Sequence, residues 1–288
     1  MNNKLGNDPL ATFLKNYDYS FWYHKIFSLD EIYKDENFIN KVSSKMKGGD
    51  VEKIRRSLAF EIFMTSQQLI ETLFMLIGAF TYSPKDPYPW MNKRDNFGYK
   101  ISNLIKDDSY EIFLKTLGLE TVDDYVRYLF YDIPTKPEFK EKLDGQIEPT
   151  KACLKLLAIE HSINEDLYNA YKHGFIAHRG DIKIIYHSPS RQMRLQSQEI
   201  PVVFALPKRL RMAAEVEVKD ERVAFDIDNV YFKKLKYERQ REISKRALVL
   251  IRDIIESRRV VLRRGDSIQI ELLPPVDEIE KIFQHDEK

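Results

Sequence analysis

The stretch that decides the fold is Val51–Phe80, which reads VEKIRRSLAFEIFMTSQQLIETLFMLIGAF. Its apolar side chains recur at steps of four and seven residues, at Leu58, Ile62, Leu69, Leu73 and Ile77. Steps of this size keep the side chains on one side of an α-helix. Further Phe and Met side chains widen the apolar surface beyond a single stripe, which is typical of a helix buried on most of its faces. We therefore predict a long helix that is central in a helical bundle.

Shorter helices are expected on the C-terminal side of this helix. Three prolines end it in a loop over residues 81–90, because proline interrupts a helix interior. Helical periodicity returns in four segments, over residues 96–106, 108–117, 121–131 and 149–175. Thr121, with Asp124 three residues later, has the spacing of an N-cap. Residues 1 to about 180 are thus expected to be mostly helical.

The period of the apolar pattern changes after Gly180. Residues 214–218 alternate strictly between apolar and charged side chains, and residues 222–227 alternate again after a polar turn. This pattern predicts a β-hairpin. The other elements expected are strands at 182–186 and 268–272, a long amphipathic helix at about 235–259 and a terminal helix from Pro274 to about Phe283.

These elements together predict the α+β class. Residues 1–180 would form an N-terminal helical bundle. Residues 181–288 would form a smaller α+β domain, with a small antiparallel sheet and the long amphipathic helix. The predicted boundary follows directly after the segment that carries the candidate site.

Charge is balanced overall, with 46 basic and 45 acidic residues, so the whole chain gives no argument for a nucleic-acid partner. Its distribution does, because residues 232–264 contain 12 Lys or Arg and four acids, a local net charge of +8. Such a segment can attract phosphate, although solvated helix faces are often as basic. The residues predicted to contact nucleic acid are Arg241, Lys245, Arg252 and Arg259.

The single cysteine and the absence of a leader pattern point to the cytoplasm. Cys153 lies in an apolar helical pattern and excludes an intramolecular disulfide, which fits a reducing compartment. The first residues lack the apolar core of a signal peptide. The most hydrophobic run, residues 70–82, contains Glu71 and is too short to span a bilayer. We therefore expect a cytoplasmic protein with no membrane partner.

The segment Leu167–Gly174 is the best candidate for chemistry. It places Asn169, Lys172 and His173 on one polar edge near a predicted helix end, where the helix dipole favours a cationic imidazole. His173 is thus a candidate general acid or base, with Lys172 stabilising negative charge beside it. A solvated helix face with His173 as a C-terminal cap is the alternative.

Metal binding is a third alternative for this helix. His161, Glu165, Asn169 and His173 follow one another at steps of four. The row lacks the adjacent Glu of His-Glu-x-x-His and has no Cys partner. We expect neither a metal nor another cofactor.

Tyr168-Asn169-Ala170-Tyr171-Lys172-His173-Gly174 resembles the Arg-Asn-x-x-x-His-Gly segment of HEPN domains. These are helical modules of prokaryotic toxins, antiviral ribonucleases and nucleotide-binding proteins. Asn169, His173 and Gly174 occupy matching positions, whereas Tyr168 stands where the family has Arg. In the family's ribonucleases, that Arg and the His cleave RNA without metal, usually across a dimer. The resemblance implies a dimer here, and Lys172 is a candidate replacement for the missing cation.

A second clue lies on the long helix, where Glu71 and Gln67 interrupt the apolar pattern. Burying a carboxylate without a partner is costly. We hypothesise that Glu71 or Gln67 faces Asn169, Lys172 or His173 across the bundle; an exposed strip is the alternative. The function expected is a HEPN-like binding or assembly module, in a prokaryotic defence or stress system, that contacts RNA or a protein partner as a homodimer. The alternative is a metal-independent endoribonuclease that uses His173 with Asn169 and Lys172.

Overall fold

The structure is a computed structural model. It describes residues 8–46, 50–93, 96–134, 136–165, 168–169, 177–180, 183–188, 191–194, 202–205, 214–218, 221–225, 233–234, 236–263 and 270–284. For the strands, and for residues 138 and 263, only the backbone is described. The chain divides into two compact units that are discontinuous in sequence. Unit 1 comprises Met1–Glu31, Thr65–Ser162 and Arg241–Lys288, and unit 2 comprises Ile32–Met64 and Ile163–Gln240.

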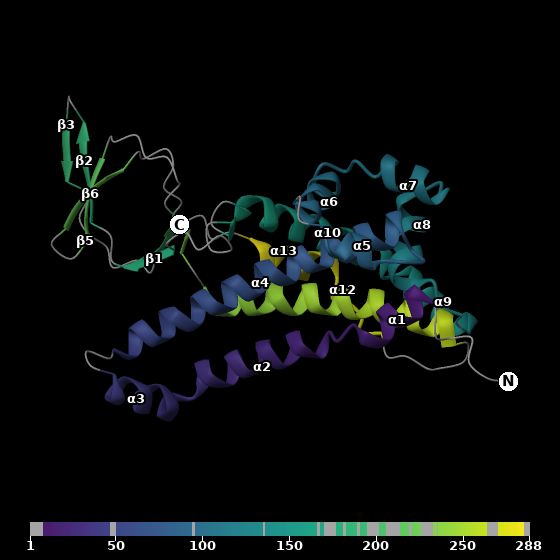
Figure 1. Cartoon of the computed structure of the whole chain (residues 1–288), viewed down its shortest axis with the longest axis horizontal. Coiled ribbons are helices and arrows are strands. Elements are labelled where there is room, and N and C mark those ends of the chain that lie inside the picture. Colours follow the sequence, from purple (N-terminus) through teal and green to yellow (C-terminus); the bar gives the residue numbers. More distant parts are fainter. Residues whose placement is uncertain are drawn as a thin grey trace. The chain divides into compact units, whose positions relative to one another are not determined.

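The helices are drawn in chain order in Figure 1. The first group is α1 (Pro9–Asn16), α2 (Ser20–Lys34), α3 (Glu36–Lys45), α4 (Val51–Tyr82) and α5 (Tyr88–Met91). The second is α6 (Phe97–Lys106), α7 (Glu111–Leu117), α8 (Val122–Val126), the π-helix η2 (Arg127–Tyr131), α9 (Pro137–Asp144) and α10 (Ile147–Ile163). The chain continues beyond the strands with α12 (Tyr237–Arg263) and α13 (Val276–Phe283).

The core of unit 1 is built around the C-terminal half of α4, as the apolar periodicity predicted. Leu69, Leu73 and Ile77 are fully buried there. Gly78 is the point of closest approach, because a Cβ at this position would lie 2.5 Å from the Phe97 ring and 2.8 Å from Ile101 on α6. The apolar side of α12 joins the same unit with Ile251 and other buried residues, namely Ile243, Ala247, Leu250, Ile254 and Ile255.

Helix α4 is also the one described helix that is long and apolar enough to cross a membrane. The apolar window is 78% buried within the molecule. Helices that form the core of a folded protein pass the same test of length and composition. The burial of α4 is therefore explained by its place in the bundle.

Unit 2 contains α3 and the N-terminal half of α4. Asp35 caps α3 by accepting a hydrogen bond from the backbone N–H of Phe38 at 2.9 Å. Arg55 on α4 forms an ion pair with Glu36 at the start of α3, and its guanidinium lies 5.7 Å from the centre of the Tyr33 ring. Within this unit, α4 is thus joined to α3 by a charged pair and to the C-terminal end of α2 by a cation–π contact.

The strands also belong to unit 2. Their bounds are β1 (Ala177–Gly180), β2 (Lys183–Ser188), β3 (Arg191–Arg194), β4 (Val202–Ala205), β5 (Ala214–Val218), β6 (Glu221–Phe225) and β7 (Lys233–Lys234). They form two antiparallel sheets, ordered β1-β4-β7 and β3-β2-β5-β6. Val218 pairs with Glu221 between β5 and β6, in agreement with the predicted hairpin.

The predicted α+β class is nevertheless wrong, because the chain is mostly helical. Among the residues whose side chains are described, 81% are helical and none lies in a strand. Helix α12, expected beside the sheet, lies from Arg241 onward in the same unit as the N-terminal helices. The predicted strand at 268–272 is also wrong where it is described, since residues 270–272 have no strand pairing. Periodicity identified α4 and α12 but not the surface on which α12 buries its apolar side.

The ends of two predicted helices were tested by the structure. Thr121 caps α8, because its hydroxyl oxygen accepts a hydrogen bond from the backbone N–H of Asp124 at 3.1 Å. This confirms the N-cap prediction. The helix predicted over 149–175 is shorter where it is described, since α10 ends at Ile163 and a turn follows at Asn164.

Candidate functional site

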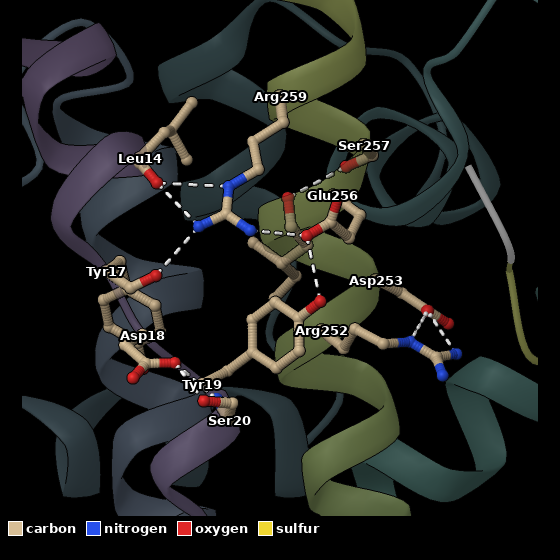
Figure 2. A network of polar contacts seen from close by, with 11 residues as sticks. Leu14, Tyr17, Asp18, Tyr19, Ser20, Arg252, Asp253, Glu256, Ser257 and Arg259 are labelled. Atoms are coloured by element: carbon tan, nitrogen blue, oxygen red, sulfur yellow. Dashed lines mark hydrogen bonds and ion pairs between the residues drawn. The ribbon is translucent and has the colours of Figure 1, made fainter. Parts of the chain in front are cut away.

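The four cations predicted to contact nucleic acid lie on α12. Two of them, Arg241 and Arg259, contact the N-terminal helices, and Arg252 contacts Glu271. Helix α12 runs antiparallel to α1 and α2. Its Arg241 pairs with Asp30 at 3.0 Å, and its Glu256 accepts a hydrogen bond from the Tyr19 hydroxyl at 3.0 Å. Arg259, further along α12, reaches the backbone of Leu14. The contacts form a polar ladder, part of which is shown in Figure 2.

Arg259 is the most fully bonded cation of this ladder. Its Nε and Nη2 donate to the carbonyl of Leu14 at 3.1 and 2.7 Å, and Nη2 also donates to the carbonyl of Tyr17 at 2.9 Å. Its Nη1 pairs with Glu256 at 2.6 Å. The last carbonyls of a helix have no partner within the helix, so Arg259 caps the C-terminal end of α1. All three guanidinium nitrogens are used within the molecule.

Arg241 and Lys245 share an acid on their own helix. Arg241 contacts Glu242 at 3.2 Å in addition to Asp30, and Lys245 pairs with Glu242 at 2.9 Å. The Lys245 side chain is 47% exposed, compared with 22% for Arg241. Lys245 is therefore the better placed of the two to meet an external ligand.

Arg252 lies between two carboxylates. It donates to Asp253 Oδ1 from Nε at 3.2 Å and from Nη2 at 3.0 Å, and Nη1 pairs with Glu271 at 2.9 Å. Asp253 is only 1% exposed, and its Oδ2 atom is buried without a hydrogen-bond partner in the described structure. Burial raises the pKa of Asp253 to about 7, against the attraction of Arg252.

The next turn of α12 supports the π-helix. The Ser257 hydroxyl donates to the Leu129 carbonyl at 3.2 Å, and Arg258 Nη2 donates to the Tyr128 carbonyl at 2.5 Å. The Arg258 guanidinium also lies 4.0 Å from the Tyr128 ring centre and 5.7 Å from that of Phe80. Burial lowers the pKa of Arg258. The sequence contains no signal for this π-helix, a type of element often found at functional positions.

The residues of the predicted catalytic site fall largely outside the described structure. Lys172 and His173 are not among the described residues, so their meeting with Asn169 stays a prediction. Asn169 is half-buried in a short helical piece with Tyr168, which is 3% exposed. The backbone N–H of Tyr168 donates to the carbonyl of Asn164 at 2.9 Å.

Glu71, predicted to support the site, and His161, part of the metal alternative, are both described. Glu71 is half-buried on α4, and its predicted approach to His173 lies outside the described residues. His161 is buried, with Nδ1 3.1 Å from the Ser102 hydroxyl and its ring stacked 6.0 Å from that of Phe74. Among the described residues, no group of three or more His, Cys, Asp or Glu could hold a metal ion. The described surroundings of His161 are those of a core histidine.

Cys153 is the remaining group with possible nucleophilic chemistry. It is fully buried on α10, and burial raises the pKa of its thiol to about 12. Since the thiolate is the reactive form, this thiol is held in its unreactive state at neutral pH.

Helix α2 carries exposed aromatic rings. Phe21 and Tyr23 are each 58% exposed and Phe27 is 54% exposed. Tyr23 and Phe27 lie four residues apart and so on one side of α2, whereas Phe21 lies about 120° or more around the helix from both; we call Tyr23 and Phe27 the aromatic face. The Tyr23 and Phe27 rings stack with centres 6.4 Å apart and planes 9° apart. Only Ile26 and Leu29 of α2 are buried. Aromatic residues of this size are usually found in a core or an interface, and the exposure of these three rings excludes the core.

Comparison with protein-family models, with curated proteins and with solved structures finds no match to this chain. We therefore base the function on the residues described above. Two of their features bear on it: the cations of α12 are bonded within the molecule, and the aromatic face of α2 is open to solvent.

Proposed function

We propose that this chain is a non-catalytic binding and assembly module that pairs with a second copy of itself through the aromatic face of α2. The observation that carries this function is the exposure of the stacked rings of Tyr23 and Phe27, each by more than half. Contiguous exposed aromatic rings are rare on monomers and are enriched in protein interfaces. Such rings also supply much of the binding energy where interfaces have been dissected.

The charges around the aromatic face favour a protein over a nucleic acid. Asp18 and Glu31 lie near its two ends, with His24 between them. Hydrogen bonds from Ser20 lower the pKa of Asp18, which keeps this carboxylate charged. Polyanion binding requires a basic surface, and the arginines of α12 nearest to α2 are already paired. A protein surface of mixed charge is the better partner.

A second copy fits this surface because the face is self-complementary. In an antiparallel pairing of two α2 helices about a two-fold axis near Phe27, the Phe27 rings of both copies meet. His24 of one copy then lies opposite Glu31 of the other. Two-fold pairs use the same patch twice, so each favourable contact occurs twice. This pairing agrees with the homodimer expected from the HEPN resemblance.

Sedimentation equilibrium over protein concentrations from about 1 to 200 μM tests the pairing. We expect a reversible dimer that Phe27→Ser and Tyr23→Ser each weaken by about tenfold or more. Phe139→Ser on α9 is the matched control, since Phe139 is also exposed, by 49%, and lies outside the aromatic face. A monomer at every concentration would contradict self-association. An equal effect of the Phe139 variant would contradict the assignment to α2.

The ribonuclease alternative rests on His173 with Asn169 and Lys172 and is tested separately. Purified protein would be incubated with several classes of RNA in EDTA, beside a His173→Ala variant. We expect no cleavage that depends on His173. Cleavage abolished by the substitution would establish a metal-independent nuclease instead.

A further inference from the structure

The C-terminal segment, which we define as residues 270–283, is attached to unit 1 by few polar contacts. Glu271 pairs with Arg252 at 2.9 Å, and the backbone N–H of Leu273 donates to Gln146 Oε1 at 2.7 Å. Leu273, Ile279 and Phe283 provide its buried apolar side chains. These polar contacts and buried apolar side chains hold the segment in the described part of the structure.

The ion pair between Arg252 and Glu271 depends on the charge of Asp253, because Arg252 also contacts this buried acid. One guanidinium faces two carboxylates, Asp253 and Glu271, so the pair of acids exceeds the cation by one charge when both are ionised. Glu256 on the same helix adds negative charge near Asp253. The Tyr131 hydroxyl of η2 is also near enough to Asp253 to interact with its charge. Asp253 Oδ2 receives no compensating hydrogen bond in the described structure.

We propose that the proton on Asp253 is a latch for the C-terminal segment, which is held when Asp253 is neutral and loosens when Asp253 is ionised. When Asp253 is neutral, Arg252 is available to Glu271 alone. When it is ionised, Asp253 competes for the same guanidinium and repels the Glu271 carboxylate. The device is independent of the pairing proposed for α2.

Thermodynamic linkage gives the direction of this coupling. The Glu271 carboxylate disfavours ionisation of Asp253, which is one of the causes of its raised pKa of about 7. Coupling between two sites is reciprocal, so ionisation of Asp253 must weaken the attachment of Glu271 by the same factor. Because the pKa lies close to neutrality, the change falls within the range from pH 6 to pH 8.5.

Amide hydrogen exchange of α13, measured on the full chain at pH 6 and pH 8.5 and corrected for intrinsic exchange, tests the latch. We expect the protection of α13 to fall about three- to tenfold between the two pH values. Asp253→Asn, which is neutral at both pH values, should abolish the change. Glu280→Gln is the matched control: Glu280 is an exposed acid of α13 that does not contact Arg252, and its variant should keep the wild-type change.

Glu271→Gln is a second test of the latch, and it does not disturb the interior because the Glu271 side chain is 57% exposed. It removes the charge that Asp253 repels, so the protection of α13 should become lower at pH 6 but independent of pH. Unchanged protection of the wild type across this range would overturn the latch. So would a full pH response that persists in Glu271→Gln.

Discussion

The outer surfaces of α2 and α12 differ in how their conspicuous side chains are used. The cations of α12 look free in the sequence, yet Arg241, Arg252 and Arg259 are bonded to acids or carbonyls of the same unit. The aromatic rings of α2 look like core residues, yet Phe21 and Phe27 are more than half exposed. The comparison shows that residue type defines what a side chain is able to bind, whereas its neighbours determine whether it is still available.

The physical cause lies in what surrounds each helix. Helix α12 meets the unpaired carbonyls at the end of α1 and those of η2, and long arginine side chains reach them with several donors. Helix α2 packs on one side only, where Ile26 and Leu29 are buried. No described element covers Phe21, Tyr23 and Phe27, so their rings stay in solvent.

The largest effect should come from breaking the contact between Arg259 and the end of α1. Arg259→Ala removes donors from the carbonyls of Leu14 and Tyr17 and removes the cationic partner of Glu256. We expect the free energy of unfolding, measured in urea, to fall by about 2 to 3 kcal/mol. Lys245→Ala serves as the control and should cost less than about 0.5 kcal/mol, because Lys245 is more exposed and, among the described residues, pairs with Glu242 on its own helix. Equal effects would mean that α12 does not support α1.

Replacing Asp253 tests, through the pH dependence of stability, how strongly the charges of α12 are engaged within the molecule. A folded-state pKa of about 7, above the ordinary value of about 3.9, means that the folded protein binds a proton which the unfolded chain releases. This contribution to stability is complete below about pH 4 and is lost as the pH rises through 7. Asp253→Asn should remove that slope and stabilise the protein at pH 8 by about 1 to 3 kcal/mol. Urea unfolding at pH 5 and pH 8 measures both, and a wild-type stability without this decline would contradict the buried acid.

A double-mutant cycle on Asp30 and Arg241 measures the interaction energy of one ion pair between α2 and α12. Both side chains are largely buried, at 15% and 22% exposed, so the coupling should exceed that of a surface pair. We expect an interaction energy of about 1 kcal/mol from Asp30→Asn, Arg241→Gln and the double variant. A coupling near zero would show that the ion pair between Asp30 and Arg241 contributes no stability.

The smallest effect on stability should come from the aromatic face. Phe27→Ser changes a ring that is 54% exposed, so the free energy of unfolding of the dilute protein should change by less than about 0.5 kcal/mol. The same variant is expected to weaken self-association strongly. A loss of stability above 1 kcal/mol at a concentration where the chain is monomeric would place Phe27 in the core instead.

The local elements were predictable because their signals are local. The four- and seven-residue steps of α4, the N-cap at Thr121 and the alternation of β5 and β6 are contained in short stretches of chain. The fold class was not predictable in the same way, because it depends on where α12 buries its apolar side. Residues 241 and 30 are far apart in the chain, and no local pattern indicates that they meet. The break after α10 was missed because the apolar steps continue through it in sequence.

The sequence by itself determined the two long helices α4 and α12 and their apolar sides, and it supplied the prediction of a site in the segment from Asn169 to His173. Only the tertiary structure decided that Arg259 caps the end of α1 and is not free to bind phosphate. It also decided that Asp253 is buried beside Arg252 and that the Tyr23 and Phe27 rings of α2 are exposed. Periodicity records the local backbone geometry that every residue shares. Pairing across more than 200 residues depends on packing, which no single stretch of the chain contains.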